Sequence, residues 1–121
     1  MSEATVDLRG LNVLVLEDEA VIAMLLEDML VDLGCKVVGP AAKVAEALQL
    51  VRSEQIGAAL LDLNLGRGET GYPVADALAA RAVPFAFVTG YGAEMPIEPA
   101  TLRNMVNSAA ASLFDSFGSE A

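Results

Sequence analysis

Residues 12–18 read Asn-Val-Leu-Val-Leu-Glu-Asp, a short apolar run that ends on two acids. A second apolar run, Gly-Ala-Ala-Leu-Leu at residues 57–61, is followed directly by Asp62. Runs of this length and composition are typical of buried strands. If the two strands lie parallel and side by side, their carboxyl ends meet at one edge, where open α/β sheets bind ligands. We therefore expect Glu17, Asp18 and Asp62 to share one pocket.

Three carboxylates in one pocket repel one another and need a counter-charge. A divalent cation with oxygen ligands supplies it, and Mg²⁺ beside a carboxylate is suited to phosphoryl chemistry. Each acid also has a local alternative: Asp18 as a helix N-cap, Glu17 as a solvated strand end and Asp62 as a turn former. These local roles do not explain why all three acids lie at the ends of strands, so the pattern favours a Mg²⁺ site.

The rest of the chain alternates strand-like and helix-like patterns, as βαβ units do. Gly34 is expected to end the first helix, Pro40 the second strand, and Asp18 or Glu19 to cap the first helix. Near-continuous apolar strands require cover on both faces. We therefore predict a doubly wound parallel α/β sheet of the flavodoxin type. Its expected strands are residues 12–16, 36–39, 58–62 and 85–88, and its expected helices are residues 20–33, 43–53 and 73–81.

Length and composition indicate one folded domain that spans residues 1–121. Hydrophobic residues make up 55% of the chain, which is enough for a core without disulfides, and the single Cys35 is expected to be a small buried hydrophobe. The formal charge of −10 opposes long contacts with nucleic acid or an anionic membrane. The sequence lacks the pattern of a signal peptide or a membrane span, so we expect a cytoplasmic protein.

Three motifs in this order resemble the receiver domain of bacterial two-component response regulators. They are Val-Leu-Val-Leu-Glu-Asp-Glu at residues 13–19, Leu-Leu-Asp-Leu-Asn at residues 60–64 and Phe-Val-Thr-Gly-Tyr at residues 87–91. Residues 84–92, Pro-Phe-Ala-Phe-Val-Thr-Gly-Tyr-Gly, further resemble the subgroup nicknamed FAT GUY. The resemblance runs from about residue 11 to residue 92, and residues 93–121 diverge.

The resemblance implies a role for each matching residue. Asp62 falls at the phosphoacceptor position, which takes a phosphoryl group from the phosphohistidine of a histidine kinase or phosphotransferase. Asp18 and Asp62 match direct ligands of the cofactor Mg²⁺, while Glu17 matches a ligand that acts through water. Asn64 lies where the family uses a backbone carbonyl as a further metal ligand.

The resemblance also implies a switch and an output. Thr89 matches a hydroxyl that binds the phosphoryl oxygens, and Tyr91 belongs to the subgroup motif. The implied function is that of a single-domain response regulator in a phosphorelay, whose phosphorylation changes its binding to an unknown downstream protein. Such a domain is not an enzyme with a separate substrate, since it promotes its own aspartyl phosphorylation and dephosphorylation.

One expected cation is absent from the sequence. Receivers usually carry a lysine at the end of a fifth strand, but no lysine follows Lys43. The region from Pro99 onward keeps helical spacing, so we expect a helix at about residues 100–117 and a missing or disguised fifth strand. Arg67 is a candidate substitute for the lysine. The alternative function is a pseudo-receiver, an interaction module that is poorly phosphorylated or not phosphorylated.

A missing fifth strand leaves the fourth strand with an open edge that must be covered. The C-terminal helix is one expected cover. A homodimer through this edge, or through Leu102, Met105 and Leu113, is the other.

Residues 66–71, Gly-Arg-Gly-Glu-Thr-Gly, offer a different function because they spell the dinucleotide-binding fingerprint. Asp62 and Glu69 would crowd a pyrophosphate with like charge. We therefore favour a glycine-rich turn over a nucleotide site.

Overall fold

The structure is a computed structural model and describes residues 8–88. Within this range the strands lie in the order β2-β1-β3-β4, and all neighbours pair in parallel. The predicted doubly wound α/β sheet of the flavodoxin type is confirmed. The elements are β1(Asn12–Leu16), α1(Ala20–Asp32), β2(Lys36–Ala41), α2(Val44–Ser53), β3(Ala58–Leu61), α3(Tyr72–Ala80) and β4(Phe85–Phe87).

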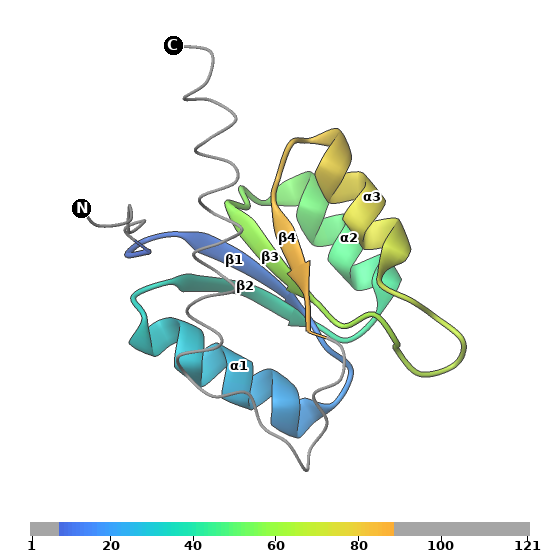
Figure 1. Ribbon diagram of the computed structural model, residues 1–121, viewed down its shortest axis with the longest axis horizontal. Coiled ribbons are helices and arrows are strands. Elements are labelled where there is room, and N and C mark those ends of the chain that lie inside the picture. The colour runs from blue at the N-terminus through green and yellow to red at the C-terminus, as the bar shows by residue number, and fades with distance from the viewer. Residues whose placement is uncertain (1–7, 89–121) are drawn as a thin grey trace, which may run out of the picture.

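Helices cover both faces of the sheet, with α1 on one face and α2 and α3 on the other (Figure 1). Side chains of β1 alternate between the two cores because successive residues of a strand point to opposite faces. Val13 and Val15 pack in the core that contains Leu26 of α1. Leu14 and Leu16 pack in the core that contains residues of α2 and α3. Burial on both faces explains why β1 is apolar from Val13 to Leu16.

The ends of the helices follow the expected local signals. Leu33 is the C-cap of α1, and Gly34 follows it with a φ of +92°, a conformation that favours glycine. Pro73 lies in the first turn of α3, where its missing N–H is not needed. Cys35 is buried, as predicted.

The prediction that β2 ends before Pro40 is wrong, since the strand continues to Ala41. Within the described residues β2 is an edge strand, and proline is tolerated there because one side of the strand carries no ladder. The register between β1 and β2 shifts at this point, and the N–H of Glu17 donates to the carbonyl of Ala41 at 2.9 Å. The longer strand therefore fixes the backbone that leads into the acidic pair.

Several predictions fall outside residues 8–88, which are the residues that the structure describes. These are Thr89, Tyr91, the C-terminal helix, the doubtful fifth strand and the three apolar residues expected at a dimer interface. Within the described part β4 pairs with β3 alone. No helix in that part is long and apolar enough to cross a membrane.

Candidate metal and phosphorylation site

The acids gather where β1 and β3 end, because the two strands are parallel neighbours in register. The N–H of Asp62 donates to the carbonyl of Leu16 at 2.9 Å, which places Asp62 level with the acidic pair. One carboxylate oxygen each from Glu17, Asp18 and Asp62 lies within 4.8 Å of the others. The three side chains that the sequence placed in one pocket do converge in the structure.

Burial differs sharply among the three acids, and Glu17 is the most enclosed. Its side chain is 5% exposed, and burial raises its pKa from 4.5 to about 7. The charges of Asp62 and Asp18 act in the same direction, while the N–H of Glu19, which donates to Oε2 at 3.1 Å, opposes them. Glu17 and Asp62 also share a side-chain hydrogen bond, in which the protonated Glu17 donates. The inner acid therefore holds a proton more readily than a free glutamate.

Asp62 is half-buried, and burial followed by the charge of Asp18 raises its pKa above the ordinary value. Two hydrogen bonds act against this rise, one from Glu17 and one from the N–H of Asn64, which donates to Oδ1 at 3.2 Å. A cation among the acids would relieve both the repulsion and the loss of hydration. A set of oxygen donors alone matches the preference of Mg²⁺.

Asp18 is exposed at the mouth of the cluster and is held by a backbone group from another loop. Its Oδ2 accepts the N–H of Gly66 at 3.1 Å. Of the two residues expected to cap α1, Glu19 occupies the N-cap position, and it makes no side-chain capping bond there. The structure instead ties Asp18 to the loop that follows β3.

That loop is a small hairpin formed by residues 64–70. Asn64 and Thr70 form an antiparallel bridge, and the N–H of Leu65 donates to the carbonyl of Glu69 at 2.9 Å. At its tip Arg67 has a φ of +65°, in the left-handed region that non-glycine residues rarely adopt. The bond of Gly66 to Asp18 anchors one side of the hairpin. Glu69 anchors the other side, because its Oε1 accepts the N–H of Val44 at 3.3 Å.

A pocket of about 400 Å³ lies between these loops, and two positively charged side chains, those of Lys43 and Arg67, help to line it. Arg67 and Asp18 therefore line the same pocket. Sequence reasoning missed the contributions of Lys43, Gly66 and Glu69. The lining residues are Asp18, Ala42, Lys43, Gly66, Arg67 and Glu69.

The glycines of residues 66–71 have structural roles that do not involve a nucleotide. Gly68 has a φ of +78° at the hairpin tip. A β-carbon on Gly71 would lie 2.6 Å from the carbonyl oxygen of Asp62, so only glycine lets α3 start this close to the acid. These roles account for the glycine-rich turn that we favoured.

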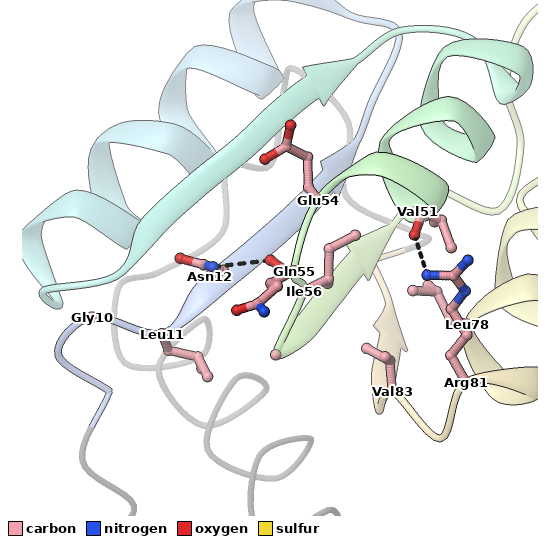
Figure 2. A pocket seen from close by; sticks show the side chains of 11 residues that line it. Gly10, Leu11, Asn12, Val51, Glu54, Gln55, Ile56, Leu78, Arg81 and Val83 are labelled. Atoms are coloured by element: carbon pink, nitrogen blue, oxygen red, sulfur yellow. Dashed lines mark hydrogen bonds between the residues drawn. The ribbon is translucent and has the colours of Figure 1, made fainter.

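A larger hollow of about 870 Å³ lies at the opposite edge of the sheet, where the strands begin (Figure 2). Leu11, Ile56 and Val83 contribute apolar lining. The Nη1 of Arg81 donates to the carbonyl of Val51 at 2.8 Å across its wall (Figure 2). None of the three clustered acids lines this hollow, which separates it from the candidate metal site.

The chain belongs to the response regulator receiver domain family, whose model matches residues 13–107. The match confirms the resemblance on which the site residues were assigned. Receiver domains bind Mg²⁺ at an acidic pocket, and the cluster of Glu17, Asp18 and Asp62 has that character. Receiver domains are not enzymes of the ordinary kind. Membership of this chain in the FAT GUY subgroup remains a prediction.

The chain is also similar to proteins named SdrG and PhyR. It is 38% identical to SdrG from Sphingomonas melonis Fr1, with a TM-score of 0.68 and coverage of 87% of this chain and 97% of that one. It is 31% identical to the receiver domain of PhyR from Erythrobacter litoralis, with a TM-score of 0.72 and coverage of 84% and 90%. Phyllosphere-induced regulator PhyR of Methylorubrum extorquens is 38% identical over 82 residues. That match covers 66% of this chain but only 31% of the relative's length.

Proposed function

We propose that this chain is a response regulator that accepts a phosphoryl group on Asp62 with the help of Mg²⁺. The convergence of three carboxylate oxygens within 4.8 Å is the observation that carries the proposal. Glu17, Asp18, Asp62 and the backbone carbonyl of Asn64 are the proposed residues of the ion site. When bound, the ion supplies the positive charge that phosphoryl transfer to an anionic nucleophile requires.

Asp62 is the group that reacts in this proposal. The N–H of Asn64 donates to its Oδ1, and the proposal makes Oδ2 the nucleophile. An oxygen–phosphorus bond forms as the phosphorus–nitrogen bond of a phosphohistidine breaks, and the electron pair returns to the imidazole nitrogen. Thr89 is the proposed donor to the phosphoryl oxygens, and Tyr91 the residue of the switching motif. Both roles are carried over from the motif resemblance, and both residues lie within the range that the family model matches.

The proposed donor is a histidine kinase or a phosphotransferase in the cytoplasm, and the proposed output is a change in protein–protein binding. PhyR from Bartonella quintana is described as an anti-anti-sigma factor, and this chain covers 52% of that protein at 23% identity. That likeness shows the fold alone. We propose an interaction output here without assigning the downstream protein.

The second candidate is a pseudo-receiver that binds partners with little or no phosphorylation. The specific observation in its favour is that no lysine follows Lys43 in the sequence, so the usual cation of the phosphorylated state is missing. Arg67, which lines the same pocket as Asp18, is the proposed partial substitute. The two candidates differ in one measurable property, which is the formation of an aspartyl phosphate.

Incubation with acetyl phosphate and Mg²⁺ tests this property directly. We expect wild-type protein to gain one base-labile phosphoryl group in intact-mass measurements, and Asp62→Asn to gain none. Asp76→Asn, which changes an exposed aspartate on α3, is the matched control and should be labelled like wild type. Wild-type protein that stays unlabelled with the ion present would favour the pseudo-receiver. Equal labelling of Asp62→Asn would remove Asp62 as the acceptor.

A further inference from the structure

Two bonds between carboxylates and backbone groups connect three separate loops around the acidic cluster. Asp18, after β1, accepts the N–H of Gly66 in the loop after β3 at 3.1 Å. Glu69, in the same loop, accepts the N–H of Val44 at the start of α2 at 3.3 Å. The hairpin of residues 64–70 therefore spans from the candidate metal site to the N-terminus of α2.

Backbone hydrogen bonds within the hairpin connect its two anchor residues, Gly66 and Glu69. Its strands are joined by the bond from Leu65 N–H to the carbonyl of Glu69 and by a 3.3 Å bond from Glu69 N–H to the carbonyl of Gly66. Arg67 is kept in the left-handed region at the tip. Such a conformation persists only where the surrounding structure determines the backbone. The position of Gly66 is thus linked to that of Glu69.

The bond from Gly66 restrains a side chain that would otherwise move freely. Asp18 is exposed, so packing alone does not fix its carboxylate. Holding Oδ2 limits the rotation of the carboxylate and leaves Oδ1 available to a cation. A ligand that is oriented before the ion arrives loses less conformational entropy on binding.

Glu69 also acts on α2 in its own right. The first N–H groups of a helix lack partners within the helix, and Val44 is the first residue of α2. Lys43, the N-cap residue, makes no side-chain capping bond. The carboxylate of Glu69 therefore serves as the cap, and its negative charge is favourable at a helix N-terminus. This cap comes from a loop 25 positions away in the sequence.

We propose that Glu69 is a positioning residue for the ion site. Its carboxylate accepts the N–H of Val44 and so fixes the hairpin of residues 64–70. Through the bond from Gly66, the hairpin orients Asp18 toward a bound cation. Through the same hydrogen bonds, binding of the ion changes the environment of Val44 at the N-terminus of α2. This inference rests on the Mg²⁺ site of the proposed function, and it assigns Glu69 no contact with the ion.

Titration of the protein with Mg²⁺, followed by calorimetry and by amide NMR, tests the proposal without any phosphorylation. Glu69→Ala should weaken Mg²⁺ binding by on the order of tenfold, as the loss of supporting contacts does at other metal sites. Glu69→Gln removes the same charge but keeps an acceptor oxygen, so it should retain most of the affinity. In wild-type protein the amide signal of Val44 should shift with Mg²⁺, and in Glu69→Ala this shift should be lost.

Glu54→Ala is the matched control for the loss of one negative charge. Glu54 is exposed at the C-cap of α2, away from the hairpin, and its replacement should leave Mg²⁺ affinity unchanged. Equal binding by wild type and Glu69→Ala overturns the positioning role, and so does equal weakening in the Gln and Ala variants. Wild-type protein that binds no Mg²⁺ would instead refute the ion site and the proposed function with it. The failures of the two proposals are therefore distinguishable.

Discussion

Glu17 is the buried charged residue of the described chain, and its setting determines how the site responds to pH. A carboxylate that loses hydration while it faces two other acids favours its protonated form. The raised pKa of about 7 means that folded Glu17 is largely protonated in mildly acidic solution and loses its proton as the pH rises through neutrality. A bound cation would reverse this preference, since positive charge stabilises the carboxylate. Binding of the proposed metal ion would thus release a proton from this residue.

The first prediction at this scale concerns stability without Mg²⁺. The pKa of Glu17 is about 7 in the folded protein and 4.5 in its ordinary state, so the folded chain binds more protons between these values. The free energy of unfolding should therefore fall as pH rises through this window, by roughly 3 kcal/mol at most. Urea denaturation at about pH 5 and about pH 8 measures the change.

Glu17→Gln is the control for this prediction, because it keeps the shape and cannot lose a proton. The variant should lose most of the pH dependence and gain stability near about pH 8. The same slope in the variant and in wild-type protein would assign the effect to other groups.

At the scale of elements, Arg81 joins the C-terminal ends of α2 and α3. It is the C-cap of α3, and its guanidinium donates to the carbonyl of Val51 in the last turn of α2 at 2.8 Å (Figure 2). The last carbonyls of a helix have no partner within the helix, so Arg81 satisfies one of them with a charged donor. Packing of the two helices on one face of the sheet depends in part on this bond.

Arg81→Ala should lower the free energy of unfolding by about 1.5 kcal/mol, the usual loss for a hydrogen bond to a charged group. Urea denaturation gives the difference. Arg52→Ala removes an exposed cation from the last turn of α2 and should cost less than about 0.5 kcal/mol. Similar losses in both variants would show that charge at the helix end, and not the bond to Val51, is responsible.

The elements also show which features a sequence reveals. Strands and helices were predictable because apolar runs, Gly34 and Pro73 are local signals. The continuation of β2 through Pro40 was not predictable, since it depends on β2 lying at an edge. The acids of the site were found because each lies within two residues of a strand end. The bonds of Gly66 and Glu69 were missed because they join residues 48 and 25 positions apart.

The whole chain carries a net negative charge, and three of its acids are gathered at one edge of the sheet. The net charge is −10, and three of the acids meet within 4.8 Å at the ends of β1 and β3. Monovalent salt screens the general repulsion, but it does not replace a ligand that fits the cluster. The response of the folded state to Mg²⁺ should therefore exceed its response to Na⁺ at equal ionic strength.

Thermal unfolding measures this difference in response. An ion that binds only the folded state at tenfold above its Kd adds about 1.4 kcal/mol, or about 5 °C in Tm for a domain of this size. Asp18→Asn should abolish the specific part of this gain, since the proposal makes Asp18 a direct ligand of the ion. Asp28→Asn, an exposed change on α1, should preserve it. Equal gains from Mg²⁺ and Na⁺ would mean that salt screens the acids without any ion binding among them. The converging acids would then lack the ion that the proposed phosphorylation of Asp62 requires.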